Sequence, residues 1–162
     1  DSNMRKAERE IRDLEEIAKP VGRCDTIRLG LLDEGAHYIV PLSFGYVAQD
    51  GRVALYFHGA KEGRKHELIE KSARVCVEGD LCHGFVPNGR GGITCDFESF
   101  IGYGDCKLVS GEEAEKGIAL LMTHCGCPEY SCPPEVMAVT AVYKITLDEI
   151  AGKRRFPDRV SR

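Results

Sequence analysis

The sequence predicts a mainly β fold, namely a six- or seven-stranded antiparallel split β-barrel with three flanking helices. Segments in which apolar and polar residues alternate recur along the chain, as expected for half-buried strands. Turn signals such as Asp33-Glu34-Gly35 and Asp50-Gly51 lie between several of these segments and indicate short hairpins. The G-x-G-x-x-G run that a dinucleotide-binding sheet needs after its first strand is absent. A small closed or split barrel therefore fits better than a doubly wound sheet.

The first part of the chain predicts a helix, a three-strand meander and a second helix. Ile11, Leu14 and Ile17 form an apolar stripe at helical spacing, and Pro20 with Gly22 is expected to end this opening helix. The meander is expected to consist of strands over 24–32, 37–48 and 52–58, followed by a helix over about 62–72.

The second part predicts further strands and a third helix. Ser110-Gly111-Glu112-Glu113 has the form of a capping box, which would open a helix whose Ile118, Leu121 and Met122 face the core. Strands are expected over 73–81, 93–98, 99–109 and 136–147, with loops over 87–92 and 125–135.

The composition is that of an ordinary soluble domain with one sizeable core. The 162 residues suit a single domain over 1–162, with mobile ends expected over 1–4 and 153–162. Hydrophobic residues make up 43% and charged residues 30%, and no apolar run approaches the length of a membrane span. The net charge of −4 argues against a nucleic-acid partner. No apolar signal segment follows Met4, so the expected location is the cytoplasm.

Eight cysteines in a chain without a signal segment do not indicate a disulfide framework. Cys24, Cys76 and Cys106 are expected to act as small buried or half-buried apolar side chains. The pair formed by Cys82 and Cys95 is also interpreted as structural, because the sequence does not fix the distance between the two.

The segment His124-Cys125-Gly126-Cys127, with Cys132 five residues on, contains the ligand types of a zinc or iron–sulfur site. Its spacing is not the paired C-x2-C arrangement, and no second pair follows. The sequence therefore predicts no metal site and a loop with free thiols. A metal or redox-sensor protein that works through His124, Cys125, Cys127 and Cys132 is an alternative function.

The most informative stretch for function is 56–65, where a strand that ends in His58 runs through two glycines into a cationic helix start. At a helix N-terminus the first backbone N–H groups lack partners and the macrodipole is positive. Lys61, Arg64 and Lys65 add full positive charges, so phosphate is the simplest ligand. The alternative is a solvated charged face, although cations are unfavourable at this end of a helix unless an anion offsets them.

Five motifs follow one another along residues 5–153: Arg9-Glu10-Ile11, Arg28-Leu29-Gly30, the run 38–46, the run 55–65 and Ser99-Phe100-Ile101-Gly102-Tyr103-Gly104. Together they resemble the 5-nitroimidazole resistance (Nim) proteins, which belong to the pyridoxamine 5′-phosphate oxidase-like flavoproteins. The resemblance implies an FMN-binding split barrel that forms a homodimer, with a flavin in each of two clefts between the subunits.

The resemblance also implies a set of flavin-binding residues. The phosphate would contact Lys61, Arg64, Lys65 and the nearby backbone of Gly59 and Ala60. Gly59 stands where many relatives carry serine, and this removes a hydroxyl that could bind phosphate. The isoalloxazine would lie along Val40, Pro41, Leu42, Ser43 and Phe44, with Ser99 of the partner strand close to the ring.

Two residue patterns agree with this implication. Pro41 cannot donate to a sheet ladder, so it belongs on an edge or at a bulge, where the free backbone of Leu42 and Ser43 can meet polar ring atoms. His58 lies at a strand end beside the expected anion site and is the candidate catalytic residue. The alternatives are a strand-end histidine that bonds to a loop and, for Phe44, ordinary barrel packing.

These inferences predict an FMN-dependent oxidoreductase, with nitroreduction of nitroimidazole-like small molecules as the candidate reaction. In such a protein the flavin carries the electrons, and the chain positions it and excludes competing reactions. The alternative is a non-catalytic binder of heme, deazaflavin or a phosphorylated vitamer on the same barrel. The expected homodimer interface lies on the strands near 93–109 and 136–147, with Phe97, Ile101, Tyr103 and Val142 as candidates.

Overall fold

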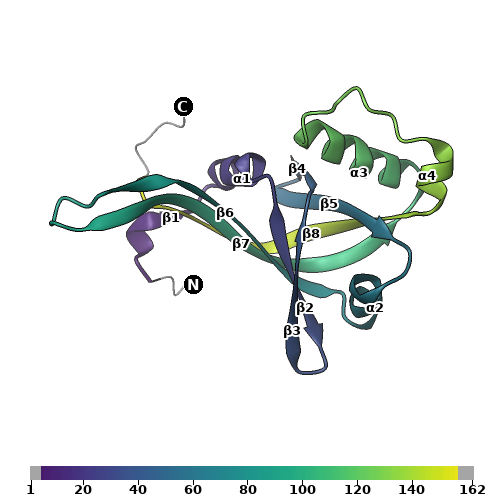
Figure 1. Cartoon of the computed structure of the whole chain (residues 1–162), viewed down its shortest axis with the longest axis horizontal. Helices are drawn as coiled ribbons and strands as arrows, with labels where there is room; N and C mark the ends of the chain where they lie inside the picture. Colours follow the sequence, from purple (N-terminus) through teal and green to yellow (C-terminus); the bar gives the residue numbers. More distant parts are fainter. Residues whose placement is uncertain (1–4, 157–162) are drawn as a thin grey trace.

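The structure, a computed structural model, describes residues 5–156 and consists of one antiparallel sheet with helices packed on it (Figure 1). This confirms the predicted mainly β split barrel with flanking helices. Its strands are β1 (Glu10–Ile11), β2 (Ile27–Asp33), β3 (Ala36–Leu42), β4 (Gly45–Gln49), β5 (Arg52–Ala60), β6 (Arg74–Pro87), β7 (Ile93–Val109) and β8 (Thr140–Arg154). Its helices are the 3-10 helix η1 (Ala7–Arg9) and the α-helices α1 (Leu14–Arg23), α2 (Arg64–Lys71), α3 (Gly111–His124) and α4 (Pro134–Ala138).

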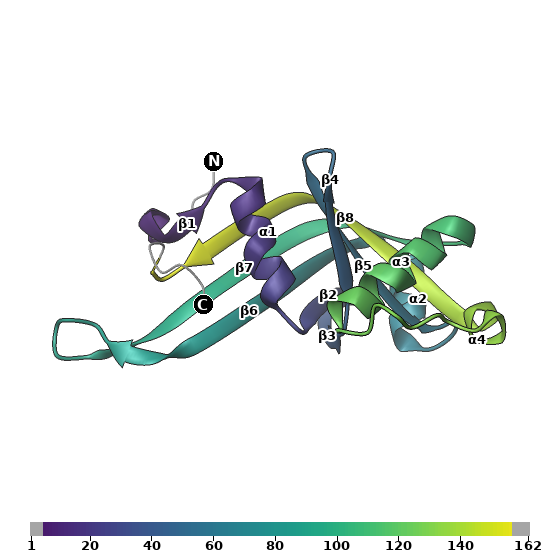
Figure 2. The ribbon, with the colours of Figure 1, turned by 90° about the horizontal axis from the view of Figure 1, so that it is seen from above.

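The strands are arranged in the order β3-β2-β6-β7-β8-β5-β4, and β1 pairs with β8. In the described part of the chain, β3 and β4 are the two edges of this path, so Pro41 lies on an edge strand as predicted. The hairpin of β6 and β7 extends as a long arm beyond the rest of the sheet (Figure 2). At the other end, α2 lies beside the β2–β3 hairpin (Figure 1).

The core lies inside the curved sheet, because alternate side chains of each strand point inward. Phe57 of β5 and Tyr143 of β8 stack there with ring centroids 5.0 Å apart. Burying one such large apolar side chain contributes about 1.5–3 kcal/mol. The largest fully buried side chains are Tyr56, Tyr143, Phe44, Phe57, Phe100, Ile27, Leu29, Leu55 and Ile145.

Helices α1 and α3 pack on the sheet. Helix α1 contacts mainly β6 and β7, and α3 contacts mainly β4 and β5. Asp13 caps α1, because its carboxylate accepts a hydrogen bond from the Glu15 backbone N–H at 2.8 Å. The buried face of α1 includes Ile17 and Val21. Helix α3 packs directly on β4 at Gly45, where a Cβ atom would lie 2.3 Å from the backbone nitrogen of Leu121. Only glycine permits this approach.

Two boundaries in the first part of the chain differ from the prediction. Ile11 belongs to β1, and α1 continues through Pro20 to Arg23. Pro20 removes one helix hydrogen bond, but it is itself buried, and the packed apolar face holds the helix together across it. The expected strand 37–48 is divided into β3 and β4, because the backbone leaves the extended ladder at Ser43–Phe44.

The strands of the arm are longer than the sequence predicts. The expected strand 73–81 continues to Pro87 as β6, and the expected strands 93–98 and 99–109 are one strand, β7. The expected division between residues 98 and 99 is therefore wrong. Asp96 and Glu98, two charged residues beside it, are buried in the structure.

The expected capping box and last strand are also corrected. Ser110 precedes α3 but makes no side-chain cap hydrogen bond. The first residues of the expected strand 136–147 belong to the helix α4 instead. Pro134 occupies the N-terminal position of this helix, which suits proline. The strand itself, β8, covers Thr140–Arg154.

The end of β8 is held on both sides. Lys153 pairs with Glu10 of β1 and with Ser99 of β7. Lys153 and Arg154, the first residues of the end that is expected to be mobile over 153–162, belong to β8. Residues 1–4 and 157–162 lie outside the described residues. No helix among residues 5–156 has both the length and the apolar character that a membrane crossing requires.

Candidate functional site

The chain passes from β5 into α2 at the residues that the sequence singles out for phosphate binding. Side chains alternate along β5, so Phe57 and Gly59 face the barrel interior, whereas Tyr56 and His58 face the side of α3. Gly63 precedes α2 with a φ of 112°, which favours glycine. No described side chain caps α2. The first N–H groups of α2 are therefore available to an anion.

Lys65 is a half-buried cation at this helix start. A Cβ atom on Gly59 would lie 2.8 Å from its Nζ, so the ammonium rests against the open side of that glycine. Nζ also lies 5.6 Å from the centroid of the Phe57 ring. Among the described residues, none forms a hydrogen bond or an ion pair with this ammonium. Desolvation by burial lowers the pKa of Lys65 below its ordinary value.

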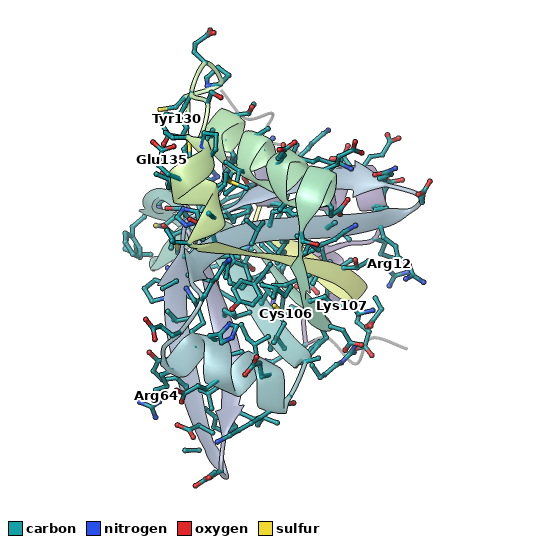
Figure 3. The ribbon with its side chains drawn as sticks, turned by 90° about the vertical axis from the view of Figure 1, so that its right-hand side faces the viewer. Arg12, Arg64, Cys106, Lys107, Tyr130 and Glu135 are labelled. Atoms are coloured by element: carbon teal, nitrogen blue, oxygen red, sulfur yellow. The ribbon has the colours of Figure 1, made fainter. Side chains whose placement is uncertain are left out.

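Lys61 and Arg64, the other two predicted phosphate ligands, are engaged elsewhere. Lys61 Nζ donates a hydrogen bond of 2.5 Å to the backbone oxygen of Ala138, at the end of α4. Arg64 bonds to the Asp33 carboxylate, and its guanidinium lies 4.3 Å from the centroid of the Tyr38 ring. Figure 3 shows Arg64 on the outer side of α2. The three cations therefore do not converge in this chain.

Helix α2 is also fixed from inside the barrel. His66 Nδ1 contacts the hydroxyl of Tyr143, and Tyr143 in turn stacks on Phe57. The buried thiol of Cys106 lies near this end of the barrel, above α2 in Figure 3, and burial raises its pKa to about 12. Lys65 thus lies in the first turn of α2, between Arg64 and His66, whose contacts hold the helix in place. The sequence carried no signal for the His66–Tyr143 contact.

His58 does not face the same side of the sheet as the Lys65 ammonium. It shares its face with Tyr56, whose hydroxyl donates a 2.7 Å hydrogen bond to Glu113 of α3. The His58 side chain is exposed, yet desolvation by the surrounding protein and the nearby Lys65 charge lower its pKa below 6.5. Its imidazole is therefore neutral at pH 7, with one nitrogen able to donate and the other able to accept a hydrogen bond.

The predicted isoalloxazine segment lies at the edge of the sheet. Val40, Pro41 and Leu42 belong to β3, and Pro41 is exposed. Phe44 is fully buried, with its ring centroid 4.5 Å from that of His124. The Phe44 side chain is thus part of the core, and only the backbone at this position remains to line a ligand.

Ser99 is distant from this segment within one chain. It pairs with Asp80 of β6, and two strands, β2 and β6, separate β7 from β3. With neighbouring strands about 4.8 Å apart, this places Ser99 about 14 Å from β3 along the sheet. Ser99 and the segment 40–44 are therefore not strand neighbours within one chain, and the resemblance implies that a second subunit brings Ser99 close to the ring.

The histidine of the cysteine-rich segment has a structural partner. His124 Nε2 donates a 2.7 Å hydrogen bond to the backbone oxygen of Cys24, which fastens the end of α3 to the chain after α1. All eight cysteines lie within the described residues and are free. Among those residues, no three His, Cys, Asp or Glu side chains lie where they could hold a metal ion together.

Replacement of Cys125, Cys127 and Cys132 by serine is expected to change the melting temperature by no more than about 2 °C and to leave FMN affinity unchanged. Cys125 and Cys127 are exposed, so their thiols contribute little packing. Calorimetry, flavin titration and elemental analysis of both proteins provide the measurement. Stoichiometric zinc or iron in the parent, together with a collapse of stability in the variant, would contradict this prediction, because a structural metal supplies folding energy.

Comparisons with known proteins show the family and the fold of the chain. The family model for pyridoxamine 5′-phosphate oxidase matches residues 13–154. The chain belongs to this family. No curated protein gives a significant sequence match.

Solved structures show the same fold. A candidate 5-nitroimidazole antibiotic resistance protein from Bacteroides thetaiotaomicron matches with a TM-score of 0.80 and 27% identity, over 89% of this chain and 85% of the other. The flavocytochrome Anf3 from Azotobacter vinelandii matches with a TM-score of 0.74 and 19% identity, over 98% and 75%. An FAD- and heme-binding protein from Mycobacterium smegmatis also matches with a TM-score of 0.74, at 13% identity, over 94% and 77%. The last two matches lie below 25% identity and show the fold that this chain shares with them.

Proposed function

We propose that this protein binds FMN and acts as a flavin-dependent oxidoreductase, with the FMN phosphate at the start of α2. The observation that carries the proposal is the Lys65 ammonium, which is half-buried and has no anionic partner among the described residues. A positive charge in this position is costly in the free protein, since burial disfavours the charged form. A phosphate dianion would offset that cost and accept hydrogen bonds from both Lys65 and the first turn of α2.

The remaining groups would bind and orient the ring system. β3 is an edge strand in the described sheet, so the backbone groups of Leu42 and Ser43 that face away from β2 are available to polar ring atoms. Bound FMN supplies electron transfer between a reductant and a small-molecule acceptor. His58 is proposed to hold or accept a proton near the acceptor, a role that its neutral imidazole suits.

The proposed homodimer is supported by an apolar row on the outer face of the sheet. Ile39, Gly30, Cys76 and Tyr103 face one another across β3, β2, β6 and β7. Ile39 is 65% exposed, Ile101 48% and Tyr103 42%, so these side chains form a patch that a second copy can cover. Val142, another candidate from the sequence, is 2% exposed beneath α3 and cannot take part.

Ile101→Asp is expected to convert the dimer to a monomer and to weaken FMN binding at the same time. An aspartate at Ile101 would be buried in the interface directly opposite Glu78 of β6, a like charge, which costs enough to weaken association at least about 100-fold. Light scattering at micromolar concentration measures the effect. Val139→Asp is the matched control, because Val139 is equally apolar and 68% exposed but lies beside α4. A parent protein that is monomeric with FMN bound would contradict the proposed dimer.

Nitroreduction is the proposed reaction, and it is supported by the similarity to the candidate nitroimidazole resistance protein. The experiment is to purify the protein, record its absorption spectrum and reduce it chemically without oxygen. A 5-nitroimidazole is then added. We expect a flavin spectrum, and oxidation of the flavin in proportion to the added nitro compound. A heme spectrum would favour the non-catalytic binder, and a reduced flavin that the nitro compound leaves unchanged would exclude nitroreduction.

A further inference from the structure

The β6–β7 arm carries two cysteines whose thiols touch. Cys82 lies on β6 and Cys95 on β7, thirteen residues apart along the chain, and the arm projects away from the barrel (Figure 2). The Sγ atoms are 3.1 Å apart, and both thiols are free. Cys82 is exposed and Cys95 is half-buried, so the pair is open to small molecules from the Cys82 side. None of the contacts proposed for FMN includes these residues.

A bulge in the arm explains why the two thiols meet. Cys82 pairs with Phe97, but the next pair is Gly84 with Asp96, so β6 has one extra residue, His83, at this point. Cys82 and Cys95 are therefore diagonal neighbours on the same face of the arm. Such neighbours are ordinarily about 7–8 Å apart, and a bulge increases the local twist of the strands. This geometry turns the two thiols toward each other.

We propose that Cys82 and Cys95 form a reversible dithiol–disulfide site that reacts with low-molecular-weight disulfides. The Cys82 thiolate attacks one sulfur of the small disulfide, forms a mixed disulfide and releases one small thiol. The Cys95 sulfur then attacks Cys82 Sγ, closes the Cys82–Cys95 bond and releases the second small thiol. The two protein thiols are oxidised by two electrons, and the small disulfide is reduced to two thiols.

The surroundings of the two sulfurs agree with this order of events. Cys82 is the more accessible thiol, so it meets the small disulfide first. The hydrogen bond from Cys95 to Cys82 raises the pKa of Cys95 to about 11, and the carboxylates of Asp96 and Asp80 act in the same direction. Cys95 thus remains protonated until Cys82 is modified, when the hydrogen bond between the two thiols is lost.

The bond would join the two strands of the arm across its bulge. The chain between the two cysteines includes the exposed turn of residues 88–92, where the Asn88 side chain accepts hydrogen bonds from the backbone N–H groups of Arg90 and Gly92. A cross-link below this turn prevents the strands from separating at the bulge, so the amides of the tip should exchange hydrogen at least about tenfold more slowly in the oxidised protein.

Oxidised glutathione is the probe that tests this proposal. The protein is first changed to serine at Cys125, Cys127 and Cys132, which removes competing exposed thiols. After treatment, remaining thiols are alkylated and the intact mass is measured. The protein should lose two hydrogen atoms and two alkylation sites, with no glutathione attached. Trypsin cleaves after Arg90, which lies between the two cysteines, so the peptides on either side of Arg90 should remain joined until a reductant is added.

Two variants identify the residues that react. Cys95→Ser should retain one stable glutathione on Cys82, because the second step is blocked. Cys76→Ser is the control for another cysteine of β6, and its Cys82–Cys95 bond should form as in the parent. The proposal is overturned if the parent accumulates glutathione adducts without closing the bond, if neither cysteine reacts, or if Cys76→Ser abolishes the joined peptides.

Discussion

Lys65→Met is expected to weaken FMN binding about 10- to 100-fold and, at the same time, to make the flavin-free protein more stable at pH 7. The loss of affinity follows from removing a charge-assisted hydrogen bond to phosphate, which contributes about 1.5–3 kcal/mol. The gain in stability follows from the lowered pKa of Lys65, because burial disfavours its charged form in the folded chain. Flavin titration and thermal unfolding of the same two samples measure both effects.

The pH dependence gives the stability effect a definite sign. Below the lowered pKa, folding has to bury the Lys65 charge, so the native protein is penalised relative to the methionine variant. As the pH rises through that pKa, the folded protein releases the proton more readily than the unfolded chain, and the penalty disappears. The difference in stability between parent and variant should therefore shrink in alkaline solution.

Arg64→Ala is the matched control for Lys65→Met. Both residues are cations in the first turn of α2, but the Arg64 guanidinium already bonds to Asp33 and lies over Tyr38. We therefore expect less than about a threefold change in FMN affinity for Arg64→Ala. A larger loss from Arg64→Ala than from Lys65→Met would contradict the assignment of Lys65 as the principal phosphate ligand.

Glu98→Gln is expected to destabilise the protein by about 3–5 kcal/mol, which is about 10 °C in melting temperature for a chain of this size. Glu98 is 2% exposed, and its carboxylate accepts hydrogen bonds of 2.8 and 2.9 Å from Arg23 Nη1 and of 3.1 Å from Arg154 Nε. Without the Glu98 charge, the positive charges of Arg23 and Arg154 repel each other where little water can screen them. Thermal unfolding of the purified variant measures the loss.

Glu16→Gln shows whether burial is the reason for that loss. Glu16 accepts a hydrogen bond of 2.6 Å from Lys19, but both side chains are substantially exposed on α1. An exposed pair contributes about 0–1 kcal/mol, so the control should unfold within about 3 °C of the parent. Equal losses from the two substitutions would mean that the Glu98 cluster does not join α1, β7 and β8 as argued.

The parts of the fold that follow local rules could be predicted from the sequence. Strand β5 and the start of α2 follow from the change from alternation to helical spacing after Gly59, and the edge position of Pro41 follows from its missing N–H. The prediction failed where tertiary contacts override local signals. The expected strand boundary after Glu98 is absent, because Glu98 lies inside β7 and is bonded there to arginines from α1 and β8.

In the candidate site, too, the local features could be predicted from the sequence and the tertiary contacts could not. The cationic start of α2 is visible in the sequence, but the partners that draw Arg64 and Lys61 away are Asp33 and the backbone oxygen of Ala138, which are remote along the chain. The proposed phosphate site at α2 can thus be inferred from the segment itself. Among the described residues, Lys65 lacks a hydrogen-bonding or ionic partner, whereas Lys61 and Arg64 have one. This difference depends on the three-dimensional packing and is not visible in the sequence.

The most direct test of the central claim is a parallel titration of the flavin-free protein with FMN and with riboflavin. The two ligands share the ring system and the sugar chain and differ only in the phosphate. If Lys65 and the N–H groups of α2 hold the phosphate, FMN should bind at least about 100-fold more tightly than riboflavin. Lys65→Met should then remove most of this difference in affinity. Equal affinities for FMN and riboflavin would contradict a phosphate site at the start of α2.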